Sequence, residues 1–128
     1  MKKIIHSKDA PKPIGAYSQA VRAGDFIFIS GQIPLDPVTM EIIEGDIVSH
    51  IHQVFDNIEA IARAADSGLY DLVKLNVFLK DLGHFNKVNE VMAERLVEPY
   101  PARAAVEVSR LPKDVDVEIE AILFLSKS

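Results

Sequence analysis

Residues 101–125 read PARAAVEVSRLPKDVDVEIEAILFL, and they alternate small or apolar residues with charged ones on either side of the polar connection SRLPKD. Such period-two alternation predicts two half-buried strands, over residues 102–108 and 115–125. Side chains two residues apart share a face of a strand. The count therefore places six residues on one side of the predicted sheet: Arg103, Ala105 and Glu107 on the first strand, and Asp116, Glu118 and Glu120 on the second.

Arg103 is flanked by Ala102, Ala104 and Ala105, so it has little bulk around it. One interpretation of this charged face is a solvated surface with ordinary cross-strand ion pairs. The other is a ligand site, because small neighbours leave room for a ligand whose carboxylate the guanidinium holds by a two-pronged hydrogen bond. A nearby glutamate such as Glu118 can orient or deprotonate a water molecule.

The residues before this stretch predict three more strands and two helices. Residues 17–35 predict a hairpin around the turn AGD, in which Gly31 shares a face with Ile27 and Ile29. Residues 72–80 predict a further strand, whose apolar side consists of Val73, Leu75, Val77 and Leu79.

The two predicted helices follow from apolar residues spaced three and four apart. The first covers residues 47–65, with Asp46 as its N-cap and Gly68 as its C-terminal stop. The second follows an N-cap at Asp81 and ends before Pro99.

The order of these elements predicts an α+β fold, with one sheet carrying both helices on a single face and residues 1–128 forming one domain. We expect Val73, Val77, Val106 and Ile119 to face the helices. Two helices cannot cover both sides of the sheet, and the side that they leave open carries Phe26, Phe28, Phe78, Ile122 and Phe124. An exposed apolar face of this kind predicts self-association.

The amino-acid composition disfavours several classes of binding partner and cellular location. The 128 residues are 48% hydrophobic, and 14 Lys and Arg against 19 Asp and Glu give a net charge of −5. This charge disfavours nucleic acid and anionic membranes as partners. Cysteine is absent, which fits the reducing cytoplasm. No segment has the pattern of a signal peptide or approaches the roughly 20 apolar residues of a membrane span, so we expect a soluble cytoplasmic protein.

Sequence motifs for a metal, a cofactor or an activated serine are not found. His50 and His52 lie two apart in a predicted helix and so on different faces, while His6 and His84 belong to distant segments. Neither a Gly-x-Ser-x-Gly elbow nor a glycine-rich phosphate loop occurs in the chain.

Several strings resemble one family: IGAYSQAV, ISGQIPLDP, NVFLKDL, VNEV and, most specifically, PARAAVEVSRLPKDVDVEIEA. They resemble the RidA family, also called the YjgF family, of enamine and imine deaminases, from about residue 10 to the C-terminus. The resemblance implies a chorismate-mutase-like α+β fold and a homotrimer whose sheets form a central barrel, with active clefts between subunits. The uncovered apolar face would then form the trimer core.

The activity that the resemblance implies is hydrolysis of 2-aminoacrylate and related 2-enamino or 2-imino acids to 2-keto acids and ammonia. It implies no metal or organic cofactor. It also implies a functional link to the pyridoxal-phosphate dehydratases that release such intermediates. This chemistry needs little from the protein, since a protonated imine is already electrophilic and requires only a held carboxylate and a positioned water.

By motif position, Arg103 matches the family's carboxylate-binding arginine and Glu118 the glutamate that positions water. Further cleft positions match Tyr17, Ser30, Gly31 and Asn89. The chain departs from the family pattern at Ala105, where cysteine is common, and it lacks the aromatic pair often found between Asn89 and Pro101.

Three functions of different classes remain open from the sequence. The first is the deaminase, which uses both Arg103 and Glu118. The second is a non-catalytic or chaperone-like trimer that binds keto or imino acids, for which Arg103 would suffice, since carboxylate binding has no use for a nearby negative charge. The third is translation inhibition or RNA cleavage, which the family has also been linked to and which the net charge of −5 disfavours.

Overall fold

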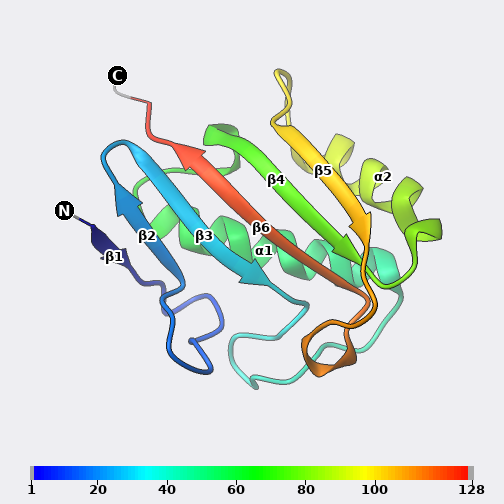
Figure 1. The fold of residues 1–128 in the computed structure, drawn as a ribbon. Coiled ribbons are helices and arrows are strands. Elements are labelled where there is room, and N and C mark those ends of the chain that lie inside the picture. Colours follow the sequence, from blue (N-terminus) through cyan, green and yellow to red (C-terminus); the bar gives the residue numbers. More distant parts are fainter. Residues whose placement is uncertain (1, 127–128) are drawn as a thin grey trace.

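The computed structural model describes residues 2–126, which form one twisted sheet with both long helices on one face (Figure 1). In chain order the strands and α-helices are β1 (Lys3–Ile5), β2 (Ala20–Ala23), β3 (Phe26–Gln32), α1 (Ile47–Ala64), β4 (Leu72–Leu79), α2 (Phe85–Arg95), β5 (Ala102–Glu107) and β6 (Val117–Phe124). Short 3₁₀ turns cover Leu69–Asp71, Leu82–His84 and Pro112–Asp114. The predicted α+β order is confirmed, and the sequence did not predict β1.

The strands lie in the order β1-β2-β3-β6-β4-β5. The β4–β5 pair is parallel, as expected for strands connected by a helix, here α2, and the other pairs are antiparallel. Strand β6 therefore lies between β3 and β4, and β4 separates it from β5. The ion pairs across the last two strands, which one interpretation of the sequence required, cannot form between strands that are not neighbours.

Helix α1 confirms the prediction at its start and corrects it at its end. The Asp46 carboxylate accepts a hydrogen bond of 2.9 Å from the Ser49 N–H, as an N-cap does. The predicted stop at Gly68 is wrong, because the helix ends at Ala64 and Asp66 takes the left-handed conformation, with φ 58°. The Ser67 N–H donates to the Ala62 carbonyl, which closes the end in the manner of a Schellman motif.

Two irregularities in the sheet reverse the predicted facing of single residues. The pairing of β3 with β6 shifts between Ile29 and Gln32, so Gly31 lies against Glu118 on the helix-free face rather than with Ile27. The pairing of β4 with β6 shifts between Leu72 and Lys74. Val73, predicted to face the helices, is therefore 40% exposed. Each extra residue inverts the alternation that follows it.

The helices and the sheet enclose the core, which includes Phe55, Ile58, Leu75 and Ile119, all with no exposed surface. Neither helix in the described part of the chain has the length and hydropathy needed to cross a bilayer.

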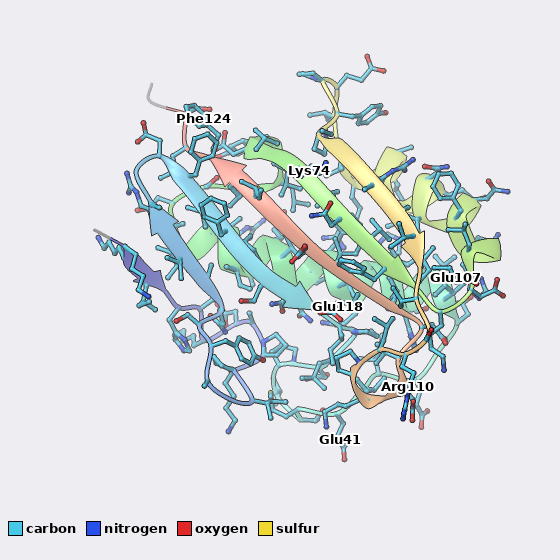
Figure 2. All side chains as sticks on the ribbon, in the orientation of Figure 1. Glu41, Lys74, Glu107, Arg110, Glu118 and Phe124 are labelled. Carbon is cyan, nitrogen blue, oxygen red and sulfur yellow. The ribbon has the colours of Figure 1, made fainter. Side chains whose placement is uncertain are left out.

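The other face of the sheet has no helix over it (Figure 1). It carries Phe26, Phe28 and Phe124, each more than 40% exposed, and the Phe26 and Phe124 rings lie edge to face at 5.1 Å. Figure 2 shows Lys74, Glu118 and Phe124 on this side of the sheet. Val106 also lies here with 46% exposure, although the sequence placed it under the helices. This open apolar face confirms that the helices cover only one side of the sheet.

Candidate functional site

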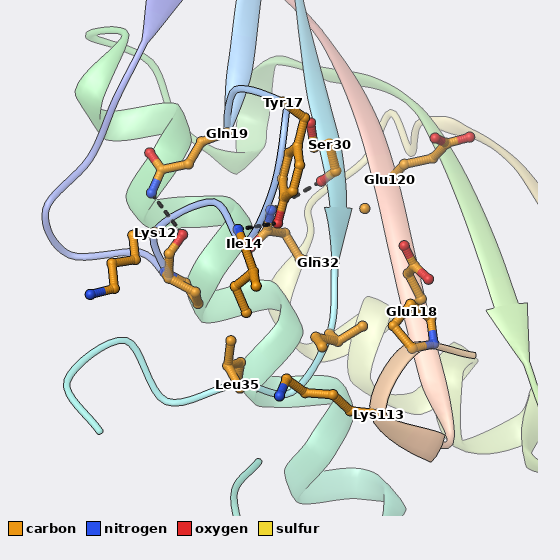
Figure 3. A pocket seen from close by; sticks show the side chains of 14 residues that line it. Lys12, Ile14, Tyr17, Gln19, Ser30, Gln32, Leu35, Lys113, Glu118 and Glu120 are labelled. Atoms are coloured by element: carbon orange, nitrogen blue, oxygen red, sulfur yellow. Dashed lines mark hydrogen bonds between the residues drawn. The ribbon is translucent and has the colours of Figure 1, made fainter. Parts of the chain in front are cut away.

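A cavity of about 610 Å³ lies at the end of β3, between β6, the N-terminal loop and the Pro112–Asp114 turn (Figure 3). Four of the predicted site residues line it: Tyr17, Ser30, Gly31 and Glu118. Glu120 lines it as well, and we call this space the Glu118 pocket.

Buried Gln19 fixes the loop that carries Tyr17. Its side chain accepts a 2.6 Å hydrogen bond from the Ser7 N–H and donates to the carbonyl groups of Ser7, Ala10 and Pro11. One side chain thus ties residues 7–11 to the start of β2. The loop is therefore held in place without helix or strand structure of its own.

Tyr17 and Ser30 both make hydrogen bonds to main-chain groups. The Tyr17 hydroxyl accepts from the Ile14 N–H at 3.1 Å, and the Ser30 hydroxyl donates to the Ser18 carbonyl at 2.6 Å. These bonds leave the Tyr17 proton and a Ser30 lone pair available, so one hydroxyl can donate to a ligand and the other can accept from it.

Gly31 is needed for the position of the Glu118 carboxylate. A Cβ atom built on Gly31 would lie 1.9 Å from Glu118 Oε2, far inside the contact distance. The glycine therefore allows the carboxylate to lie directly against the β3 backbone.

Glu118 is the side chain in this pocket with the most unusual electrostatics. Its side chain is half-buried, and within residues 2–126 it has no hydrogen-bond donor. Burial, and secondly the charge of Glu120, raise the pKa of Glu118 above its ordinary value of 4.5. Unlike Glu118, Glu120 has a hydrogen-bond donor, because it accepts a 3.1 Å hydrogen bond from the Asn76 amide. A carboxyl group with a raised pKa in a cleft is suited to exchanging protons.

Arg103 lies in a second cavity, of about 360 Å³, together with Asn89 and Tyr100. Its guanidinium donates to the Asn89 side-chain oxygen and to the Met92 sulfur, and its centre lies 4.7 Å from the centroid of the Phe85 ring. Within residues 2–126 it has no carboxylate partner. A cation held by a neutral amide, a sulfur and an aromatic face keeps its charge free for an anion.

The room beside Arg103 has a different origin from the one that the sequence suggested. Ala102 and Ala104 point to the opposite face of β5, because Arg103 faces α2. The space comes instead from the cavity between α2 and Tyr100.

The structure divides the predicted site residues into two groups. Arg103 and Asn89 lie on the helix side of the sheet, whereas Glu118 lies on the open side. Strand β4 separates the strands that carry them, so Arg103 and Glu118 do not meet within this chain. The predicted sharing of one face by the charges of β5 and β6 is therefore wrong.

The sequence analysis did not predict several residues that contact Arg103 or line the Glu118 pocket. Phe85 and Met92 contact Arg103, and their spacing of four and three from Asn89 places all three near one helix face. Lys12 and Lys113 line the Glu118 pocket from loops, where no periodicity marks them.

The histidines lie apart from both cavities. His50 Nε2 lies 3.0 Å from the Ile43 carbonyl, and His52 Nε2 lies 3.5 Å from Glu94. Among residues 2–126, no three His, Asp or Glu side chains are grouped so that they could hold a metal ion.

A family model and several known proteins are similar to this chain over nearly its whole length. The family model described as endoribonuclease L-PSP matches residues 7–124. A RutC family protein of Pyrococcus horikoshii is 58% identical over 97% of this chain and 98% of its own. A protein of Dermatophagoides farinae named 2-iminobutanoate/2-iminopropanoate deaminase is 41% identical over 97% of each chain.

The fold of this chain is also similar to that of a solved structure. The crystal structure of RidA from the Antarctic bacterium Psychrobacter superposes with a TM-score of 0.92 at 51% identity, covering 96% of this chain and 99% of that one. This match confirms the RidA-like fold that the sequence motifs predict. The chain belongs to the RidA/YjgF family.

Proposed function

We propose that this protein is a deaminase that hydrolyses 2-aminoacrylate and related 2-enamino and 2-imino acids to 2-keto acids and ammonia. The observation that carries the proposal is the Glu118 carboxyl group, half-buried in a cavity with no donor in the described chain and with its pKa raised. The relative named 2-iminobutanoate/2-iminopropanoate deaminase supports the same reaction.

The proposed reaction needs one water and one proton shuttle. Ionised Glu118 takes a proton from a water molecule while the water oxygen attacks C2 of the protonated imine, which gives a carbinolamine. Glu118 then returns the proton to the amino nitrogen, the C–N bond breaks, and ammonia leaves while the carbinolamine hydroxyl gives its proton to Glu118 and the C2–O bond becomes a carbonyl. Glu118 passes this proton to the departing ammonia and is ionised again. The protonated imine and water are consumed and 2-keto acid and ammonium are produced, with no electrons exchanged and no cofactor required.

Arg103 is the proposed anchor for the substrate carboxylate. Because one subunit holds Arg103 and Glu118 on opposite faces of its sheet, we propose that each site is completed across a subunit boundary. Arg103 and Asn89 would come from one subunit, and the residues of the Glu118 pocket from its neighbour.

We expect the assembly to be a homotrimer. The reason is the helix-free face, where three exposed phenylalanines would be removed from water, at about 25 cal/mol for each Å² of apolar surface buried. At micromolar concentration, light scattering should give three times the 14.2 kDa mass of the chain. A monomeric mass would rule out a site shared between subunits.

If Glu118 acts as proposed, full activity requires glycine at position 31. Gly31→Ala places a methyl group where Oε2 now lies, so the flexible carboxylate must turn away while the backbone stays in place. We expect imine hydrolysis to fall about tenfold through misplacement of the base, with the melting temperature nearly unchanged. A matched control is Gly68→Ala, because the extended backbone there, with φ −163°, accepts any residue and the added methyl would meet only the exposed Tyr70 ring, outside the Glu118 pocket. Full activity of Gly31→Ala would show that Glu118 is free to act from elsewhere.

The activity is tested by coupling a serine or threonine dehydratase to the purified protein and following the keto acid as it appears. Such a dehydratase is the proposed source of substrate, and we propose the cytoplasm as the shared location, which the absence of cysteine supports. Faster keto-acid release is the expected result. An unchanged rate together with 2-keto-acid binding would favour a non-catalytic binding protein instead.

A further inference from the structure

The Glu118 pocket has an acidic side and a basic side. Glu118 and Glu120 project into it from β6, while Lys12 comes from the N-terminal loop and Lys113 from the Pro112–Asp114 turn. In Figure 3 the Lys113 side chain extends away from Glu118 toward Leu35. Neither lysine forms an ion pair with any of the described residues 2–126, so both charges are available to a ligand.

The turn that carries Lys113 is held in an uncommon conformation. Lys113 and Asp114 both have φ 55°, a region that residues other than glycine seldom occupy. The Asp114 N–H donates to the Leu111 carbonyl and the Val115 N–H to the Pro112 carbonyl, and the Val115 side chain is buried. The turn runs directly into β6, so it fixes the backbone of Lys113 relative to Glu118.

Apolar side chains line the space between the two sides. Ile14, Ile33 and Leu35 belong to the same lining, and the cavity measures about 610 Å³. Volumes of roughly 300–1,000 Å³ are typical of pockets for ligands much larger than a three-carbon acid. A three-carbon imino acid at Glu118 would therefore leave the basic side of the cavity empty.

We propose that Lys113, assisted by Lys12, binds a second carboxylate at the end of the substrate side chain, so that the preferred substrates are 2-imino dicarboxylic acids. This inference rests on the proposed function. The C2 atom lies at Glu118, the side-chain methylenes contact Ile14 and Leu35, and the terminal carboxylate reaches Lys113. The reaction that supplies such a substrate is the oxidation of an acidic amino acid to its imine.

Charge excludes the other placements of the side chain. A terminal carboxylate beside Glu118 and Glu120 would meet two like charges, whereas on the basic side it meets the unpaired cation of Lys113. A basic side chain would meet the reverse arrangement, and an uncharged one would leave both lysines without a partner.

A matched pair of substrates tests the inference. The imines of glutamate and norvaline have five carbons each and differ in the terminal carboxylate, and an amino-acid oxidase generates each in the assay. Wild-type protein should show the higher kcat/KM for the glutamate imine. Lys113→Gln should lower the ratio of the two kcat/KM values about three- to tenfold, as expected for a partly exposed charge pair.

The control variant is Lys8→Gln, which removes the same charge from an exposed residue outside the pocket lining. It should keep the wild-type ratio. An equal fall in the ratio for Lys8→Gln would assign the effect to net charge, and an unchanged ratio for Lys113→Gln would overturn the proposal.

Calorimetry separates this inference from the proposed function, because it needs no turnover. 2-Ketoglutarate should bind wild-type protein more tightly than 2-ketopentanoate, and Lys113→Gln should abolish most of that difference. Raising the salt concentration should weaken it as well. If neither imine is hydrolysed, the deaminase proposal fails, while the recognition of a second carboxylate stands or falls on these affinities. Equal binding of the two keto acids by wild-type protein would overturn it.

Discussion

Glu118→Gln is expected to lower imine hydrolysis by about 10²- to 10⁴-fold, the range typical of a lost general acid or base. The amide keeps the size of the side chain but cannot take a proton from water or return one to the leaving nitrogen. The measurement is the rate of keto-acid release in the coupled assay. Undiminished turnover would reject Glu118 as the catalytic group.

The stability of Glu118→Gln toward unfolding provides a second, independent test of the role of Glu118. Folding raises the pKa of Glu118, chiefly through burial. The ionised carboxylate is therefore disfavoured in the folded subunit, and the favourable contribution of the protonated form is lost as the pH rises through the folded pKa. We expect Glu118→Gln to be at least as stable as wild type at pH 7, with the difference vanishing below about pH 4. A large loss of stability would instead indicate a structural ion pair.

Glu120→Gln is the matched control, since it removes one negative charge from the same face of β6. It also removes the second cause of the raised Glu118 pKa. Because the base acts in its ionised form, the acidic limb of the pH–rate profile should move to lower pH, with the rate at neutral pH largely retained. A loss as large as that of Glu118→Gln would show that the two carboxylates act as one unit.

Arg103→Lys is expected to lower kcat/KM by about 10²-fold with the fold intact by circular dichroism. The ammonium keeps the charge but loses the planar pair of donors that grips a carboxylate, and a hydrogen bond to a charged group contributes about 1.5–3 kcal/mol. It also loses the flat contact with the Phe85 ring.

Arg63→Lys is a suitable control for Arg103→Lys, because the Arg63 side chain is 72% exposed and pairs with Glu59 on α1. It should behave as wild type. Binding of 2-ketobutyrate should weaken in Arg103→Lys and persist in Glu118→Gln, because only the first variant disturbs the proposed anchor. Equal turnover by Arg103→Lys and wild type would remove Arg103 from the site.

The sequence correctly predicted the elements that depend only on interactions between residues close together in the chain. Asp46 caps α1 because its side chain needs only the N–H three residues later, and the β2–β3 hairpin needs only a tight turn between alternating residues. The exposed phenylalanines also followed from alternation, since two helices cannot cover both sides of a sheet.

The predictions that were wrong concern how segments distant in the sequence pack against one another. Alternation fixes the facing of each strand but not which strand lies beside it, so the insertion of β6 between β3 and β4 could not be foreseen. Arg103 faces α2, where its guanidinium contacts the Phe85 ring and the Met92 sulfur, and the sequence of β5 alone does not show which of its faces α2 covers. The irregularity before Gln32 turns Gly31 to Glu118, and no local pattern marks it.

Mixing the two inactive variants tests the central claim, a hydrolytic site formed by Arg103 of one subunit and Glu118 of another. Arg103→Lys and Glu118→Gln are unfolded, mixed in equal amounts, refolded together and assayed for imine hydrolysis. In randomly mixed trimers about a quarter of the sites would combine an intact Arg103 with an intact Glu118, so activity should return to about a quarter of wild type. Mixed trimers as inactive as the separate variants would contradict the account.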